Sequence, residues 1–155
     1  MTHLRVLGIG SPFGDDRLGW EVIKGLQQCA PLQALTDDKL QLQCCDRPGM
    51  RLLELMRNAQ SVILIDAVKS GARPGTLHAL QMSDLAGLNA PFSSHASGVA
   101  DALKMGEVLK LLPPELLIYG IAIEDAGAGF IGTKHARDVV KRLVSRIAKR
   151  ILTQY

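Results

Sequence analysis

A chain of 155 residues with 47% hydrophobic and 21% charged side chains has the composition of a globular protein, and its length predicts one domain over residues 1–155. The net charge of +3 is small, and three Phe, two Tyr and one Trp are too few for a base-stacking nucleic-acid surface. Much of the basic excess lies near the C-terminus and predicts a solvated helix face rather than a nucleic-acid site: Lys134, Arg137, Lys141, Arg142, Arg146, Lys149 and Arg150.

The first predicted element is a buried strand over Leu4–Gly10, which runs into a glycine-rich turn. Apolar residues with helical spacing follow over Leu18–Gln28. Two adjacent carboxylates, Asp15 and Asp16, stand between the strand and the helix. Open α/β sheets place ligands at such turns, at the carboxyl ends of parallel strands. Because two carboxylates repel a phosphate, the turn favours a metal cation or a polar peptide as its ligand.

A polar connection over Pro31–Lys39 leads to a second strand, Leu40–Cys45, in which apolar and polar residues alternate. This alternation predicts less burial than in the first strand. The composition of Asp46–Gly49 indicates a turn, and a short helix is expected over Met50–Arg57. Ser61–Val68 is the clearest strand, because four consecutive large aliphatic residues suit a central parallel strand covered on both faces.

The second half of the chain continues the alternation of strands and helices. We predict a Gly/Pro turn over Lys69–Gly75 and a short strand over Thr76–Leu80. An irregular segment is expected over Leu85–Ser97. A helix over Val99–Leu112 and a strand over Glu115–Ile123 follow. Thr133 is then expected to cap a long C-terminal helix. The pattern predicts an α/β fold: a single domain with a mainly parallel twisted sheet of about five strands and helices on both faces.

Three residues could carry chemistry: Asp16 after the first strand, Asp66 near the end of the third, and His95 before a helix. The two aspartates fall on the same carboxyl edge of a parallel sheet. Two carboxylates and an imidazole suit a divalent cation that keeps open positions for water or substrate. Structural roles remain open for each: a helix cap for Asp16, a hydrogen-bonded buried carboxylate for Asp66, and an ordinary loop histidine for His95.

Several other chemistries find little support in the sequence. Gly8 and Gly10 begin a pattern close to the dinucleotide-binding fingerprint, but Phe13 stands where the third Gly or Ala is required. Asp46 follows Gly10 by far more than the roughly 20 residues of that fingerprint. A G-x-S-x-G elbow and an H-E-x-x-H motif are absent. A hydrolase with this sequence would therefore rely on water and a metal rather than on a protein nucleophile.

The cysteines and the N-terminal sequence bear on the compartment. Cys29, Cys44 and Cys45 lack C-x-x-C spacing, which favours small apolar residues in a reducing compartment over a zinc site or a disulfide framework. Cys44 and Cys45 should point to opposite faces if they lie on a strand. We find no secretory signal pattern and no stretch that approaches the length of a membrane span, so we predict a cytoplasmic protein.

Four blocks of the sequence together resemble the hydrogenase maturation endopeptidases. They occur in the family's order and span most of the chain: Gly8–Gly19, Val62–Val68 with Pro74–Thr76, Ser94–Leu103 and Leu117–Asp125. The resemblance implies a metal-dependent hydrolase, an endopeptidase that removes a C-terminal extension from the nickel-loaded precursor of a nickel–iron hydrogenase large subunit. It implies nickel that arrives with the substrate and serves in recognition, and no nucleotide. The implied partner is the precursor, with no nucleic acid and no membrane.

The resemblance also assigns roles to particular residues. The family's metal-contacting residues match Asp16, Asp66 and His95, which are thereby implied as both catalytic and metal-contacting. Many members carry Glu at the position of Asp16. The aspartate is shorter than glutamate but still supplies a carboxylate. The residue after His95 is Ala96, where Gln is common, so a contact that orients the ligand could be moved.

The segment after the second strand is associated with substrate choice in this family. It is glycine- and threonine-rich in many members but reads Asp-Arg-Pro-Gly here, and Asp46, Arg47 and Gly49 are the implied substrate-binding residues. Two alternatives remain: a non-catalytic module that docks a metalloprotein precursor, and a nucleotide-binding Rossmann-like protein. The intact Asp16, Asp66 and His95 favour the enzyme over the docking module.

Overall fold

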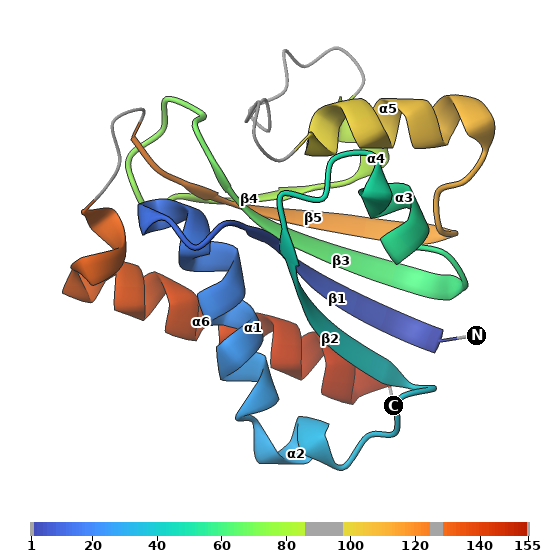
Figure 1. The fold of residues 1–155 in the computed structure, drawn as a ribbon. Helices are drawn as coiled ribbons and strands as arrows, with labels where there is room; N and C mark the ends of the chain where they lie inside the picture. Colours follow the sequence, from blue (N-terminus) through green and yellow to red (C-terminus); the bar gives the residue numbers. More distant parts are fainter. Residues whose placement is uncertain (1, 86–97, 125–128, 155) are drawn as a thin grey trace.

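The computed structural model describes residues 2–85, 98–124 and 129–154, and these build a five-stranded sheet in the order β2-β1-β3-β5-β4 (Figure 1). The strands are β1 (Thr2–Gly10), β2 (Leu40–Asp46), β3 (Ala59–Val68), β4 (Leu77–Leu80) and β5 (Glu115–Ala122). The helices are α1 (Leu18–Gln27), α2 (Ala30–Gln33), α3 (Arg51–Leu55), α4 (Met82–Leu85), α5 (Val99–Leu109) and α6 (Lys134–Gln154). Two 3-10 turns, η1 (Gly14–Arg17) and η2 (Phe130–Gly132), precede α1 and α6. All strand pairs are parallel except β4 with β5.

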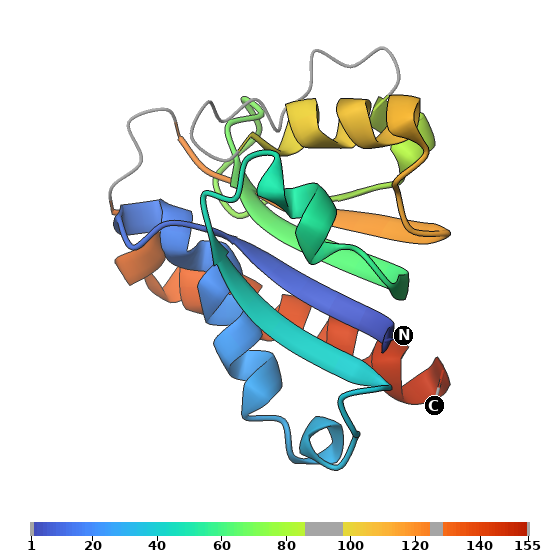
Figure 2. The same ribbon diagram turned by 45° about the vertical axis from the view of Figure 1, so that its right-hand side comes forward.

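Helices cover both faces of the sheet. The face that packs against α1 and α6 carries Val6, Ile63 and Ile65, whereas the face beneath α3 and α5 carries Leu7 and Leu64 (Figures 1 and 2). Alternate residues of β1 and β3 thus enter opposite cores, which is why these strands read as continuous apolar runs. Each fully buried Leu or Ile contributes about 1.5–3 kcal/mol relative to an exposed side chain.

The structure confirms the predicted fold class. Ser61–Val68 was predicted to be a central parallel strand, and β3 lies in the middle of the sheet between β1 and β5. The second strand is less buried than the first, as its alternating sequence predicts. Thr133 caps the last helix, because its Oγ1 accepts a 3.1 Å hydrogen bond from the N–H of Ala136.

Several elements differ from the predictions in their bounds. The predicted polar connection Pro31–Lys39 contains most of α2, which begins at Ala30, has Pro31 in its first turn and buries Leu32 against the α1–α6 core. The helix predicted over Val99–Leu112 ends at Leu109, since Lys110 adopts a left-handed conformation with φ of 57°. The N–H of Lys110 then closes the helix on the carbonyls of Gly106 and Glu107. The predicted irregular segment Leu85–Ser97 lies outside the described residues apart from Leu85, which ends α4.

Glycines allow the turn after β1 to lie directly against the sheet. A Cβ on Gly10 would stand 2.0 Å from the carbonyl oxygen of Asp16, and one on Gly19 would stand 2.7 Å from the carbonyl oxygens of Ile9 and Ile65. A larger residue at either position would push η1 and the start of α1 away from β1 and β3. The two glycines therefore set the position of Asp16 at the carboxyl edge of the sheet.

Within the described parts of the chain, no helix combines the length and the apolar character needed to cross a bilayer.

Candidate active site

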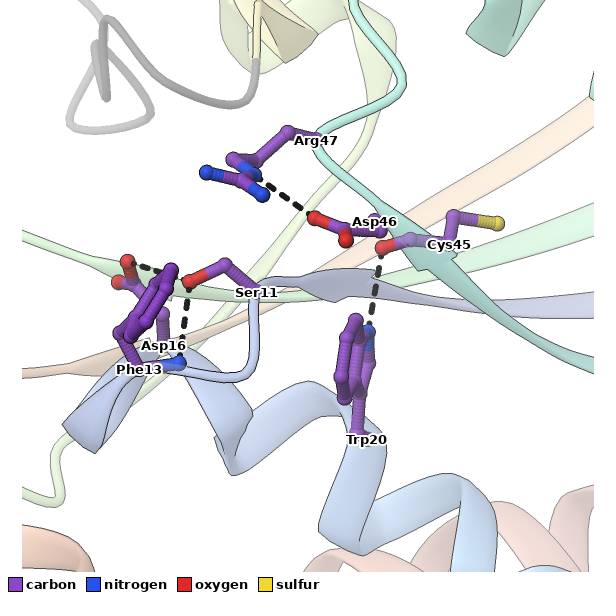
Figure 3. Close-up of polar contacts among 7 residues, drawn as sticks. All are labelled: Ser11, Phe13, Asp16, Trp20, Cys45, Asp46 and Arg47. Atoms are coloured by element: carbon purple, nitrogen blue, oxygen red, sulfur yellow. Dashed lines mark hydrogen bonds and ion pairs between the residues drawn. The ribbon is translucent and has the colours of Figure 1, made fainter.

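Asp16 lies on η1, immediately beyond the carboxyl end of β1. Its Oδ2 accepts a 3.2 Å hydrogen bond from the Ser11 hydroxyl (Figure 3). Its backbone carbonyl accepts a second bond of 3.2 Å, from the Ser11 N–H. The Asp16 N–H in turn donates to the Phe13 carbonyl at 3.2 Å. These bonds close the turn on itself and hold a half-buried carboxylate in one orientation. Asp16 is an acid in the first turn of η1, but its side chain does not cap α1, whose N-cap residue is Arg17 without a side-chain cap hydrogen bond.

Asp66 lies on β3, near its carboxyl end. The side chain is only 5% exposed, and its neighbour on β5 is Gly120. It shares a face of β3 with Leu64 and Val68, which belong to the core beneath α3 and α5. The η1 turn contacts β3, so the two predicted aspartates come from adjoining parts of the same sheet edge. A buried carboxylate at the carboxyl edge of a parallel sheet is a candidate functional group, so Asp66 remains a candidate site residue.

Arg47 and Phe13 face each other across the rim of the site. The Nε–H of Arg47 donates a 2.7 Å hydrogen bond to Oδ1 of Asp46, and the guanidinium carbon lies 5.7 Å from the centre of the Phe13 ring (Figure 3). The pKa of Arg47 is raised, chiefly because Asp46 accepts this hydrogen bond, with the negative charges of Asp46 and Asp16 adding to the effect. Asp46 and Arg47, predicted to bind substrate, therefore stand beside Asp16.

The turn between β2 and α3 connects this rim to α5. Arg47 and Gly49 adopt left-handed conformations with φ of 42° and 55°, and the Arg47 N–H donates to the carbonyl of Gly10. A Cβ on Gly98, the residue before α5, would lie 2.9 Å from the Cα of Gly49. Gly49 is thus packed against Gly98. The turn from Arg47 to Gly49 therefore contacts the end of β1 through Arg47 and the start of α5 through Gly49.

His95, the third predicted ligand, lies outside the described residues, as does Ala96 after it. Across residues 2–85, 98–124 and 129–154, no three His, Cys, Asp or Glu side chains are grouped so as to hold a metal ion. Of the predicted ligands, the structure describes only Asp16 and Asp66. Their carboxylate oxygens suit a divalent cation, but two ligands do not complete a metal site. The predicted trio stays a prediction.

Sequence reasoning did not anticipate three residues that shape this edge. Phe13 is 67% exposed although it is aromatic, and Asp15 is only 1% exposed although it is acidic. The N–H of Ile131 donates a 2.8 Å hydrogen bond to Oδ1 of Asp15, while Oδ2 of Asp15 has no hydrogen-bond partner among the described residues. Trp20 donates from Nε1 to the Cys45 carbonyl at 3.1 Å. The position of Phe13 between Pro12 and Gly14, a turn sequence, was the one local signal of an exposed ring.

The cysteines behave as predicted from a strand. Cys44 is exposed and Cys45 is buried, on opposite faces of β2, and no disulfide joins the free Cys29, Cys44 and Cys45. Burial raises the pKa of Cys45 to about 11, with a further contribution from Cys44. Both facts favour neutral thiols over metal-binding thiolates in these two residues.

Comparison with known proteins connects this geometry to one family. Residues 47–154 match the sequence model described as HycI, hydrogenase maturation protease. The hydrogenase expression/formation protein HupD of Rhodobacter capsulatus is 26% identical over 128 residues, which make up 79% of this chain and 59% of HupD. The chain thus spans about three fifths of the length of that relative.

Two solved structures share the fold. The hydrogenase maturating endopeptidase HybD from E. coli has a TM-score of 0.75 at 22% identity, with 99% of this chain and 94% of HybD covered. The [NiFe] hydrogenase maturation protease HycI from Thermococcus kodakarensis KOD1 has a TM-score of 0.64 at 19% identity, with 98% and 93% covered. At these identities the likeness establishes a shared fold rather than a shared substrate.

Proposed function

The chain belongs to the hydrogenase maturation protease family, and we propose that it is an endopeptidase that removes a C-terminal extension from the nickel-loaded precursor of a nickel–iron hydrogenase large subunit. The observation that carries this proposal is the placement of Asp16 and Asp66 on one edge of a parallel sheet, with Asp16 fixed by two hydrogen bonds from Ser11. Enzymes with open α/β sheets place their reacting groups at that edge.

In this proposal Asp16, Asp66 and His95 contact the nickel that the precursor brings. A divalent metal in such a setting can polarise a peptide carbonyl or lower the pKa of a bound water. The chain itself supplies positioned carboxylates: Ser11 orients Asp16, and the position of Asp66 on β3 fixes the second oxygen ligand relative to the first. A precursor without nickel would offer these residues no cation, so the site would distinguish loaded from unloaded precursor.

Arg47 and Asp46 would bind the polypeptide near the cleavage site. Because Asp46 holds the guanidinium through Nε, the terminal nitrogens of Arg47 remain directed away from that bond and can donate to backbone carbonyls or to a carboxylate. Both side chains are about half exposed, at 47% and 49%, so a substrate can reach them. The Phe13 ring beside Arg47 adds an apolar contact to the same rim.

The proposed reaction belongs to the cytoplasm, where a precursor would be processed as it matures. The free cysteines are suited to that reducing compartment.

Gel-shift processing of a large-subunit precursor, prepared with and without nickel, tests the proposal. We expect a shift only for the nickel-loaded precursor. Cleavage of both forms would remove the role of nickel in recognition but keep the endopeptidase. A stable complex with the loaded precursor, without cleavage, would instead establish a docking module.

A further inference from the structure

The strand β2 forms one free edge of the sheet, next to β1 and with no strand on its other side within the described chain (Figure 2). The bonds at its two ends show which backbone groups face outward. The N–H of Leu4 donates to the Lys39 carbonyl, and the N–H of Arg47 donates to the Gly10 carbonyl. In a parallel ladder, alternate residues of a strand bond to the same neighbour. From Lys39 to Arg47, the backbone N–H and carbonyl groups of odd-numbered residues therefore point toward β1, and those of even-numbered residues point outward.

Leu42 and Cys44 present unpaired backbone groups at this edge. The outward N–H of Leu40 is taken by the Thr36 carbonyl at 3.0 Å. The N–H and carbonyl groups of Leu42 and Cys44 bond to no described residue. Four adjacent backbone groups are therefore available to a further strand.

The edge also lacks the usual protection against pairing. Natural edge strands carry charged residues, prolines or bulges that discourage an added strand. From Leu40 to Cys45 the sequence of β2 holds neither a charged residue nor a proline. Partial desolvation by the surrounding protein raises the pKa of the exposed Cys44 thiol, so this side chain is neutral too. An uncharged edge fits an extended polypeptide segment as its ligand.

A cavity of about 510 Å³ runs beside this edge. Its lining is mostly polar and includes Gln33 of α2, Asp37, and Gln41, Leu42 and Gln43 of β2, whereas Leu26, Leu32 and Leu40 at its base are at most 6% exposed. Peptides that add a strand to a sheet gain affinity from main-chain hydrogen bonds and gain specificity from pockets that take alternate side chains. The cavity can supply such a pocket for a polar side chain, with glutamine amides and the Asp37 carboxylate as hydrogen-bond partners.

The carboxyl end of β2 leads into the candidate active site. Asp46 is the last residue of β2, and Arg47 beside it packs on Phe13 next to Asp16 (Figure 3). A strand paired with Leu42 and Cys44 reaches that rim in about two further residues, or roughly 7 Å at 3.3 Å per residue. From there the segment crosses the end of β2 toward Asp16, which follows β1 and lies two strand spacings away, or about 10 Å at 4.8 Å each. The edge and the site can therefore be spanned by one extended chain.

We propose that the outer edge of β2 binds an extended segment of the precursor as an additional strand and directs the adjoining cleavage site toward Asp16. This inference rests on the proposed function. A second copy of this chain could also pair with the edge, but pairing of two copies would not make use of the path from β2 to Asp16.

Amide hydrogen exchange tests the proposal at single residues. The chain is pulse-labelled with deuterium alone and within the first turnover of nickel-loaded precursor. We expect the amides of Leu42 and Cys44 to be unprotected in the free chain and at least tenfold slower to exchange with precursor. The amides of Gln41 and Gln43 face β1 and should be protected in both samples, which provides an internal control.

Three other results of this experiment would contradict the proposal. Cleavage with no change at Leu42 and Cys44 would overturn the docking edge and leave the proposed function intact. Neither cleavage nor complex formation would overturn both. Protection of Leu42 and Cys44 that rises with the concentration of the chain alone would assign the edge to a second copy.

A backbone substitution provides an independent test. Cys44→Pro removes one outward N–H at an edge position where proline is tolerated, and Cys44→Ala keeps the N–H and reports the loss of the thiol alone. We expect the KM for the precursor to be roughly 3- to 10-fold higher for C44P than for C44A, as for the loss of about one hydrogen bond, with kcat unchanged. Equal KM values in two folded variants would contradict the proposal.

Discussion

Asp15 accepts a 2.8 Å hydrogen bond from the backbone N–H of Ile131, a residue 116 positions later in the chain. The bond joins η1 to η2 and so connects the turn after β1 to the start of α6. Because Asp16 follows Asp15 directly, this contact also restrains the carboxylate of the candidate site.

Replacement of Asp15 should loosen this connection. We expect Asp15→Ala to lower the free energy of unfolding by about 1–3 kcal/mol, because the N–H of the half-buried Ile131 loses its acceptor. Asp15→Asn keeps an oxygen that can accept the bond and should lose less. Urea denaturation of the wild type, Asp15→Ala and Asp15→Asn measures both effects. Equal losses of unfolding free energy in the two variants would show that the bond to Ile131 is not the cause.

Replacement of Asp16 or Asp66 should stop processing and leave the fold intact. Asp16→Asn retains an oxygen for the Ser11 hydroxyl, so we expect a thermal unfolding midpoint close to that of the wild type. Loss of a positioned reacting group should reduce the cleavage rate at least a hundredfold. Processing assays beside thermal melts separate the two properties, and substantial cleavage by either Asn variant would remove that residue from the site.

His95→Ala should likewise abolish processing. The prediction rests on the family resemblance, since His95 lies outside the described residues. We expect an unchanged melting temperature, because a metal ligand at the site surface contributes little to the core. A large loss of stability would indicate a structural histidine instead.

Arg47→Ala should weaken binding of the precursor more than it slows the chemical step. Arg47 contacts Asp46 and Phe13 at the rim of the site, so we expect an increase in KM of about tenfold, with a smaller change in kcat. Arg57→Ala is a matched control, because Arg57 is an exposed arginine paired with Glu54 at 3.9 Å on another part of the surface. Equal effects of the two variants on KM would rule out a specific role for Arg47.

Cys45 should resist alkylation in the native protein. Its side chain is buried, and its pKa of about 11 lies above the ordinary thiol value, so little thiolate is present at pH 8. Because the folded state holds this proton more tightly than the unfolded state, its contribution to stability is complete below the ordinary thiol pKa of 9.0 and is lost as the pH rises toward 11. Iodoacetamide labelling with and without urea measures the protection, and rapid native labelling of Cys45 would contradict it.

The sequence predicted what local patterns can report. The aliphatic run before Asp66 predicted a strand buried on both faces, and the Asp46–Gly49 composition predicted the turn that carries Arg47. Both signals depend on residues that lie close together in the chain. The carboxyl edge was predictable as well, because it follows from the order of parallel strands and helices.

The contacts that complete the site depend on tertiary structure. Nothing near Asp15 in the sequence indicates that its partner is the N–H of Ile131. The stacking of Arg47 on Phe13 also joins two turns from different strands. The exposed edge of β2 required the strand order, which local periodicity does not determine.

The proposed function requires that this chain cut one peptide bond near the C-terminus of a nickel-loaded precursor. Intact-mass spectrometry of that precursor, incubated with the wild type and with Asp16→Asn, tests it most directly. We predict the loss of a single C-terminal fragment with the wild type and an unchanged mass with the variant. An unchanged precursor mass with both proteins, although the precursor binds the wild type, would contradict the claim.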